Sequence, residues 1–190
     1  MTSTRKQIEA ILAGDGRSFA ALVERYKRLV SHIVFRMIRG RADQEDLCQE
    51  VFIKVYENLG SFNHQSKLST WIARITYNTC LHFVERKRVP LFEDCVSDGK
   101  TVDDCEGSAP APDRWAESRQ TSERLCEEID RLPVHYGLIL SLFHLQEMSY
   151  AEIGEILGMP DGTVKSYLFR ARKLLKKRVV AKRAREGLCA

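Results

Sequence analysis

Apolar residues recur at three- and four-residue steps along most of the first 90 positions, as they do on the buried side of α-helices. One stripe contains Phe19, Leu22, Val23, Tyr26, Val30, Ile33, Val34 and Met37. A second contains Leu47, Val51, Phe52, Val55, Tyr56 and Leu59, and Gly60 follows it. A third, from about Leu68 to Arg86, contains Trp71, Ile72, Ile75, Leu81, Phe83 and Val84. The pattern predicts that the N-terminal part of the chain is a helical bundle.

Short local signals predict where these helices end. Gly14 and Gly40 are typical of helix termini. Asp43 has a carboxylate that can accept hydrogen bonds from the free N–H groups of a first turn, so we expect the second helix to begin near it. The polar segment Ser61 to Ser66 predicts a loop before the third helix.

The helical pattern is absent from Val89 to about Ala116, where three of the five prolines and many Asp and Glu residues lie. This composition is typical of a flexible linker. The pattern resumes near Glu117, Pro133 interrupts it, and a new apolar run follows from Leu138 to Leu145. Strand-type alternation is not visible, so the sequence predicts an all-α fold of two helical domains joined by a flexible acidic linker.

A helix-turn-helix is predicted near the C-terminal end. Ser149 and Glu152 are spaced as a capping box, which begins a short helix with Ile153, Ile156 and Leu157 facing inward. Gly158 ends that helix, Met159-Pro160 makes the turn, and Asp161 or Thr163 can cap the next helix. Gly154 is the small residue expected where the two helices touch. This arrangement is typical of helices that read DNA.

The second helix of this motif has the side chains expected of a recognition helix. Lys165, Ser166, Phe169 and Arg170 lie near its start, where side chains reach base edges in the major groove. Lys173 and the basic residues up to Arg185 follow without an acid, so they can meet phosphates. The alternative is a basic, solvated helix that interacts only with its own dipole.

Aromatic and polar residues are mixed around the predicted loop. Phe62, Trp71, Tyr77 and Phe83 flank Asn63, His64, Gln65, Lys67, Arg74 and Asn78. Such a mixture can stack on and hydrogen-bond to unpaired bases. Aromatic residues of helices more often belong to the core, and Trp71 in particular can cap it, so both interpretations stay open here.

Charge is distributed unevenly. Residues 1–90 carry 15 Lys/Arg against 9 Asp/Glu, residues 91–130 carry 4 against 12, and residues 131–190 carry 11 against 5. Two blocks of net +6 therefore flank an acidic middle of net −8 within a chain of net +4. The asymmetry indicates either two lobes that face a polyanion or two solvated helical surfaces joined by an acidic linker.

Several classes of protein are not supported. No run approaches the roughly 20 apolar residues of a membrane span, and Glu9 follows Arg5 and Lys6 without the apolar core of a secretory signal. Six cysteines are present without a Cys-x-x-Cys pair, so we expect no metal site and mostly free thiols, with redox sensing as the alternative. No catalytic constellation or phosphate loop is evident, and we expect neither an enzyme nor a cofactor.

With these motifs in place, the chain resembles a bacterial extracytoplasmic-function sigma factor of the sigma-70 family. The segment Asp43–Leu59, then Phe62, then Ser69-Thr-Trp-Ile-Ala-Arg-Ile is similar to the family's second region. Leu132-Pro133 and the stretch Ser149–Arg172 are similar to its fourth region. The resemblance covers about residues 7–88 and 120–178.

The resemblance implies a role for each part. In the second region, Asp43, Asp46, Gln49 and Glu50 would bind core RNA polymerase. The melted strand of the −10 element would be held by Phe62, Asn63, Lys67, Trp71, Arg74 and Asn78. The −35 duplex would be read by Thr163, Lys165, Ser166, Phe169, Arg170 and Lys173. Ala73 stands where some relatives carry an aromatic residue, which is a departure from the family pattern.

The same resemblance implies the organisation and the partners of the chain. Residues 1–88 would form the region 2-like domain, 89–119 the acidic linker, 120–180 the region 4-like domain and 181–190 a basic tail. Core RNA polymerase, promoter DNA and an anti-sigma factor are the expected partners, in the cytoplasm and without a membrane span of its own. The rival hypotheses are a dimeric regulator that binds only duplex DNA and a small enzyme or RNA-binding helical protein.

Overall fold

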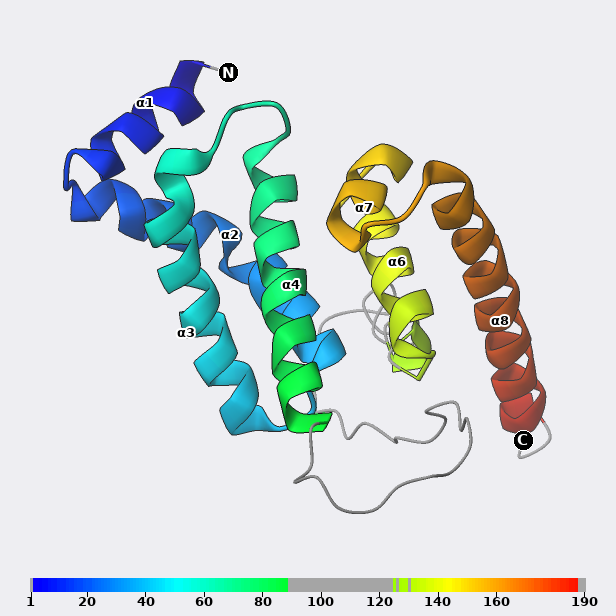
Figure 1. The fold of residues 1–190 in the computed structure, drawn as a ribbon. Coiled ribbons are helices and arrows are strands. Elements are labelled where there is room, and N and C mark those ends of the chain that lie inside the picture. The colour runs from blue at the N-terminus through cyan, green and yellow to red at the C-terminus, as the bar shows by residue number, and fades with distance from the viewer. Residues whose placement is uncertain (1, 89–124, 126, 130, 188–190) are drawn as a thin grey trace. The chain divides into compact units, whose positions relative to one another are not determined.

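The computed structural model describes residues 2–88, 125, 127–129 and 131–187. All regular secondary structure in these residues is helical, so the predicted all-α class is confirmed. Figure 1 labels the elements in chain order. They are α1 (Thr2–Leu12), α2 (Gly16–Met37), α3 (Arg41–Asn58), the 3₁₀ turn η1 (Leu59–Ser61), α4 (Leu68–Arg88), α6 (Val134–His144), α7 (Tyr150–Leu157) and α8 (Asp161–Gly187). The predicted linker lies outside the described residues.

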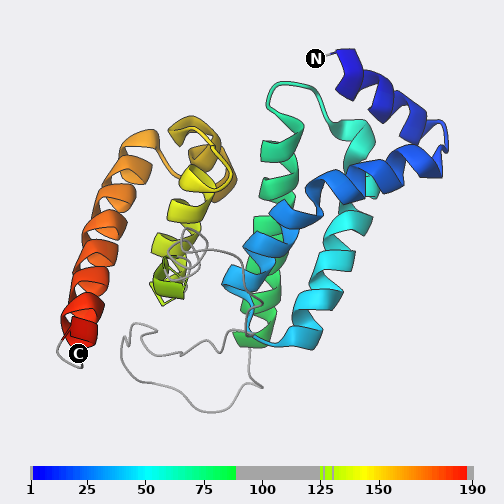
Figure 2. The same cartoon turned by 180° about the vertical axis from the view of Figure 1, so that it is seen from behind.

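The chain divides into two compact units, which are described separately. In the first, α3 and α4 run antiparallel and α2 crosses both of them, while α1 packs on α2 and η1 (Figures 1 and 2). The apolar stripes predicted from the sequence meet in one core. Its most deeply buried members include Leu22, Val30, Val34, Leu47, Val51, Val55 and Ile72.

Local chemistry sets the boundary between α1 and α2. Gly14 adopts φ +94, a left-handed conformation that side chains disfavour, and it ends α1 as the sequence predicted. Asp15 is the N-cap of α2 and accepts hydrogen bonds from the Ser18 hydroxyl at 2.6 Å and the Arg17 backbone N–H at 3.0 Å. These two bonds, Ser18 first, lower the pKa of Asp15.

The start of α3 differs from the prediction. The helix begins at Arg41 with Gly40 as N-cap, and no side chain caps it. Asp43 lies inside the first turn, and its carboxylate pairs with Lys87 near the end of α4. The prediction that Asp43 caps this helix is therefore wrong, because a partner 44 residues away takes the carboxylate.

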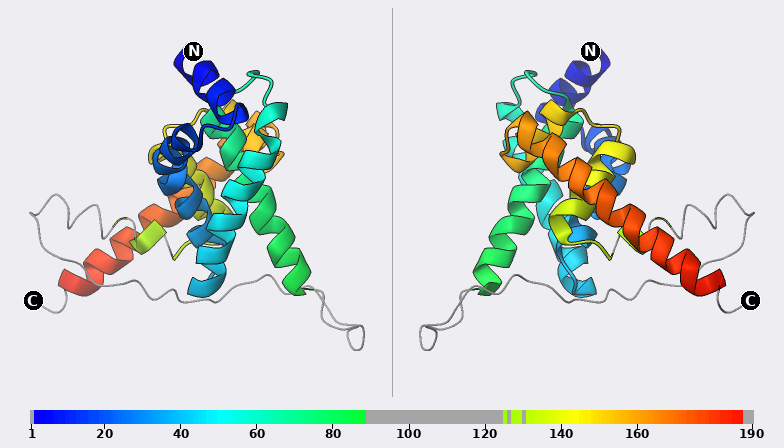
Figure 3. Two further views of the ribbon diagram at one scale, coloured as in Figure 1. Left: turned by 90° about the vertical axis from the view of Figure 1, so that its left-hand side faces the viewer. Right: turned by 90° about the vertical axis from the view of Figure 1, so that its right-hand side faces the viewer.

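In the second unit, α6 and α8 pack against each other (Figure 1). Leu138, Ile139, Leu140 and Leu142 of α6 are at most 1% exposed, and Pro133 is the N-cap of that helix. Figure 3 shows α8 as one continuous helix, and it extends to Gly187 through part of the expected basic tail. Residues 125 and 127–129 are helical and precede Arg131 and the buried Leu132.

Two described cysteines lie in the first unit. Cys80 is fully buried, and burial, followed by the charges of Cys48 and Glu50, raises its pKa to about 12. Cys48 is half-buried, and burial also raises its pKa, although its thiol donates to the Ser31 hydroxyl at 3.9 Å. Because the thiolate is the reactive form, neither thiol is activated at neutral pH. The remaining four cysteines lie outside the described residues.

Candidate nucleic-acid interface

The turn into the helix-turn-helix is built as the sequence predicted. The Ser149 N–H donates to the Glu152 carboxylate at 2.8 Å, and the Glu152 N–H donates to the Ser149 hydroxyl at 3.3 Å. This reciprocal pair is a capping box, and it is confirmed. Gly158 follows α7 with φ +66, which favours glycine, and Gly154 is buried within α7. Asp161 is the first residue of α8 and lies in its first turn.

α8 has two opposite faces. Its inner face is buried and contains Val164, Leu168 and Ala171, which follow one another at steps of four and three residues. Its outer face follows the same spacing on the other side and consists of Ser166, Arg170, Lys173 and Lys177, all exposed. Since a helix repeats every 3.6 residues, the two sets are held apart by the helix itself. Packing therefore orients the basic side chains away from the unit.

Two cations lie beside the outer face, over a pair of stacked rings. Phe143 of α6 and Tyr150 of α7 stack with ring centroids 5.2 Å apart and an interplanar angle of 11°. The Lys165 ammonium lies 5.5 Å from the centroid of Tyr150, and the Arg172 guanidinium lies 5.2 Å from that of Phe143. Arg172 also contacts a ring nitrogen of His144 at 3.3 Å. Burial and then the Arg172 charge lower the pKa of His144.

The other predicted −35 residues differ in availability. The Phe169 side chain is 69% exposed. Large aromatic side chains are usually more buried than this. The Ser166 hydroxyl donates to the Gly162 carbonyl at 2.9 Å, and Thr163 is half-buried. Arg170 and Lys173 are exposed. Phe169 and Arg170 are therefore both accessible on the first turns of α8.

The loop between η1 and α4 does not present its aromatic rings to solvent. Phe62 and Trp71 are each 7% exposed, and their centroids are 5.4 Å apart within the core. His64 has φ +59, a rare conformation for a side-chain-bearing residue, and its ring meets Phe62 edge-on at 4.7 Å. The Asn63 side chain accepts a hydrogen bond from the Gln65 N–H at 3.1 Å and so shapes the turn. The core interpretation of Phe62 and Trp71 therefore describes this structure.

The polar members of the predicted −10 site lie nearer the surface. Asn63, Lys67 and Asn78 are exposed, and Arg74 is half-buried. Ala73, where some relatives have an aromatic residue, is completely buried. The structure thus places the site's amide and basic groups outside and its aromatic support inside.

The outward face of α3 is acidic with an apolar centre. Asp46, Gln49 and Glu50 are exposed, and Glu50 pairs with Lys54 at 2.7 Å. Ile53 is 57% exposed next to them, and the sequence analysis did not single it out. The sequence could have indicated this exposure, because helical spacing places Ile53 outside the apolar stripe that contains Val51 and Val55. Asp43 is half-buried and pairs with Lys87, so it is separate from the exposed set.

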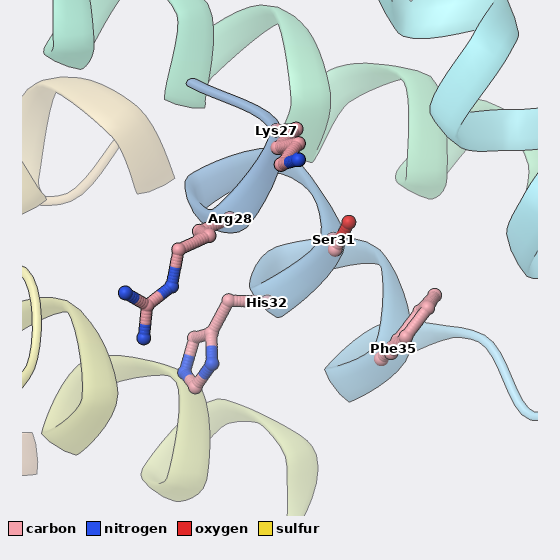
Figure 4. A pocket seen from close by; sticks show the side chains of 5 residues that line it. All are labelled: Lys27, Arg28, Ser31, His32 and Phe35. Atoms are coloured by element: carbon pink, nitrogen blue, oxygen red, sulfur yellow. The ribbon is translucent and has the colours of Figure 1, made fainter. Parts of the chain in front are cut away.

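A shallow pocket lies on α2, away from the predicted sites. Figure 4 shows its lining residues, with Arg28 and His32 directed to the same side of the helix. They are Lys27, Arg28, Ser31, His32 and Phe35. Within the described residues no group of three or more His, Cys, Asp or Glu side chains is placed to hold a metal ion. No described helix is long and apolar enough to cross a membrane.

A helical bundle followed by a helix-turn-helix unit is the architecture of a sigma-70 protein, and comparison with known proteins agrees. Sigma-70 region 2 matches residues 22–89 and sigma-70 region 4 matches residues 122–175. The ECF RNA polymerase sigma factor SigW of Bacillus subtilis is 32% identical over 179 residues, which cover 92% of this chain and 96% of that protein. The ECF RNA polymerase sigma-E factor of Escherichia coli K12 is 32% identical over 178 residues, covering 90% and 92%. The chain belongs to the extracytoplasmic-function group of the sigma-70 family and directs transcription initiation at promoters.

Solved structures share the fold. CnrH, solved in complex with the cytosolic domain of CnrY, is 19% identical and has a TM-score of 0.63, covering 93% of this chain and 97% of its own. The sigma factor RpoE of Bartonella quintana, solved with the anti-sigma factor NepR, is 18% identical with a TM-score of 0.61, covering 85% and 96%. At these identities the likeness shows the fold.

Proposed function

We propose that this sigma factor reads the −35 duplex with the outer face of α8, holds the melted −10 strand at the loop before α4, and docks on core RNA polymerase with the outward face of α3. The observation that carries the proposal is the outer face of α8. Its basic side chains are exposed along one side of a helix whose opposite side is buried in the unit. A helix of this kind fits the major groove with its first turns toward the bases.

Six residues make the −35 contacts in this proposal: Thr163, Lys165, Ser166, Phe169, Arg170 and Lys173. Arg170 has the exposure and the planar donor pair to bind guanine O6 and N7. Phe169 offers an apolar contact for a thymine methyl group. Lys173, one turn further along, meets phosphate. Lys165 reaches the bases after it leaves the Tyr150 ring.

At the −10 element, the exposed polar groups contact the unpaired strand and the buried rings support them. Asn63, Lys67, Arg74 and Asn78 are the proposed direct contacts, since amide and basic groups bind base edges and phosphates. Phe62 and Trp71 set the shape of the loop from inside the core. A base captured here would lie against the surface that these rings support.

On α3, Asp46, Gln49 and Glu50 are the proposed polymerase contacts, because they are exposed on one side of the helix. Asp43 supports them by joining the start of α3 to the end of α4 through Lys87. Ile53 extends the surface with apolar area.

The remaining assignments follow from the family. We infer a region 2-like domain in residues 1–88, a linker in 89–119, a region 4-like domain in 120–180 and a basic end in 181–190. An anti-sigma factor is a proposed partner, supported by the sigma factor RpoE of Bartonella quintana, which was solved with one. The protein would act without catalysis of its own and in the cytoplasm, where polymerase and promoters meet.

A promoter selection tests the proposal. Core polymerase and the full chain are incubated with a randomised duplex library, and the bound DNA is sequenced. We expect two enriched elements at a fixed spacing, one near −35 and one near −10. Enrichment no different from that of core polymerase alone would contradict the proposal, and enrichment of one inverted repeat would favour a dimeric duplex-binding regulator.

A further inference from the structure

Two carboxylates that precede α6 contact the distal part of α8. The Glu128 carboxylate accepts from Arg131 at 3.0 Å, from Arg178 at 3.3 Å and from Lys182 at 3.3 Å. Glu127 is 3.5 Å from Lys182. The Glu128 side chain is only 5% exposed. We call these five residues the ion cage.

The ion cage continues the inner face of α8. Beyond Ala171, the same helical spacing leads through Leu175 to Arg178 and Lys182. The inner face therefore changes from apolar to basic at the point where the carboxylates of residues 127 and 128 meet it. Lys173 and Lys177 lie on the outer face and are exposed. These four basic residues, Lys173 and Lys177 against Arg178 and Lys182, therefore form two groups on opposite faces of the helix.

Glu128 is held in its charged form. Burial alone would raise the pKa of this carboxyl, but hydrogen bonds from Lys182 and Arg178 and the charge of Arg131 outweigh it, so the pKa is lowered. Removing one partner of a buried ion pair leaves an uncompensated charge, which is costly. DNA phosphates outside the helix are therefore poor competitors for Arg178 and Lys182.

We propose that Glu127 and Glu128 remove Arg178 and Lys182 from the DNA-binding charge of α8 and are thereby specificity-determining residues of this sigma factor. The proposal rests on the assignment of α8 as the DNA-binding helix. Each cation that neutralises a phosphate adds about 0.9 to the slope of log affinity against log salt, whatever the sequence. Freed cations would help scrambled DNA more, because no base contact then fixes the orientation of the helix.

A matched pair of lysine variants tests the ion cage while both of its carboxylates stay in the chain. Lys177→Gln and Lys182→Gln remove the same charge from the same helix, five residues apart. We measure binding of the full chain to fluorescent cognate and scrambled −35 duplexes over a salt series. Lys177→Gln is expected to lower the slope by about 0.9, and Lys182→Gln is expected to leave it unchanged. Equal losses in both variants would overturn the proposal.

Elution from heparin repeats the comparison without a promoter. Lys182→Gln should elute at the salt concentration of the unaltered protein and Lys177→Gln earlier. If the two variants elute in this order but the unaltered full chain binds cognate and scrambled duplexes alike, the proposed function is contradicted. The sequestration of Lys182 by the ion cage is then still supported. Discrimination between the duplexes with identical elution of both variants would contradict only the ion cage.

The reverse variant frees the cations. Glu128→Gln should raise the salt slope for scrambled duplex by about 1 to 2 and tighten its binding. Glu24→Gln is the control, because it makes the same charge change in the first unit. It releases the exposed Lys27, whose ammonium lies 2.6 Å from the Glu24 carboxylate. Adding Arg178→Gln and Lys182→Gln to Glu128→Gln should abolish the gain. A folded Glu128→Gln protein with an unchanged slope would count against the proposal, and the lysine pair decides if this variant does not fold.

Discussion

At the residue scale, the recognition helix contains side chains that are ready to bind DNA and side chains that first have to leave a partner. Lys165 lies over the Tyr150 ring, a contact worth about 0.5–1 kcal/mol at an exposed site. Ser166 is bonded to a carbonyl of the previous turn. Arg170 is exposed on the outer face. Arg170 is therefore the residue from which we expect the clearest effect on sequence reading.

Arg170→Ala should weaken binding to a cognate −35 duplex by roughly 1–3 kcal/mol and relax preference at one or two base pairs, because a bidentate base contact is lost. Lys176 is exposed and lies further from the first turns of α8, so Lys176→Ala is the comparison variant. It should weaken all sequences about equally and lower the salt dependence by about one counterion. Competition binding against single-base variants of the −35 element measures both effects.

The same modest loss on every sequence for both variants would show that α8 provides only general attraction. The contrast between the two is informative because each removes one positive charge. A difference between them therefore reports on position along the helix and not on net charge.

Sequence spacing was sufficient to predict the hydrogen-bond partners of residues whose partners are close in the chain. Ser149 and Glu152 cap each other as expected, since they are three residues apart. Asp43 was assigned wrongly because Lys87 belongs to another helix. The burial of Phe62 and Trp71 was only one of two alternatives, since periodicity does not show which side of a loop faces the core.

At the element scale, the three apolar stripes correctly indicated α2, α3 and α4, and the apolar run from Leu138 to Leu145 falls on α6 and its C-cap. Beyond Ala171 the sequence mixes apolar residues such as Leu174, Leu175 and Val179 with basic ones. Nothing local reveals that Arg178 and Lys182 meet carboxylates about 50 residues earlier. The charge count placed Glu127 and Glu128 in the acidic middle, and the helical pattern around them gave no sign of their partners. Long-range ion pairs have no periodicity and so could not be predicted.

The ion cage makes the second unit sensitive to acid. Because the folded-state pKa of Glu128 is lowered, its contribution to stability is present above the ordinary glutamate value, about 4.3, and is lost as the pH falls through the folded value. We expect the thermal midpoint of the full chain, followed by circular dichroism, to fall more steeply between neutral pH and about pH 3 in the unaltered protein than in Glu128→Gln.

Glu24→Gln is the control for this measurement, since the Glu24 pair is largely exposed and contributes little. Its pH dependence should follow that of the unaltered protein. Parallel curves for Glu128→Gln and the unaltered protein would mean that the ion cage does not stabilise the folded chain.

At the scale of the whole molecule, two compact units are joined in one chain. The uneven charge and the loss of helical pattern indicated two parts from the sequence alone. Joining two modest binding surfaces makes the second contact intramolecular, and affinity then rises through effective concentration. This explains how small surfaces on α8, α4 and α3 can together select a promoter.

The most direct measurement of this account is promoter opening by the reconstituted holoenzyme. Core polymerase and the full chain are mixed with a selected promoter that carries a fluorescent base analogue in the −10 element. We predict a fluorescence rise that requires the protein and an intact −35 element. The double variant Asp46→Lys with Glu50→Lys should strongly reduce it, because its reversed charges oppose docking on polymerase. Equal opening by core polymerase alone, or by the doubly reversed variant, would contradict this prediction.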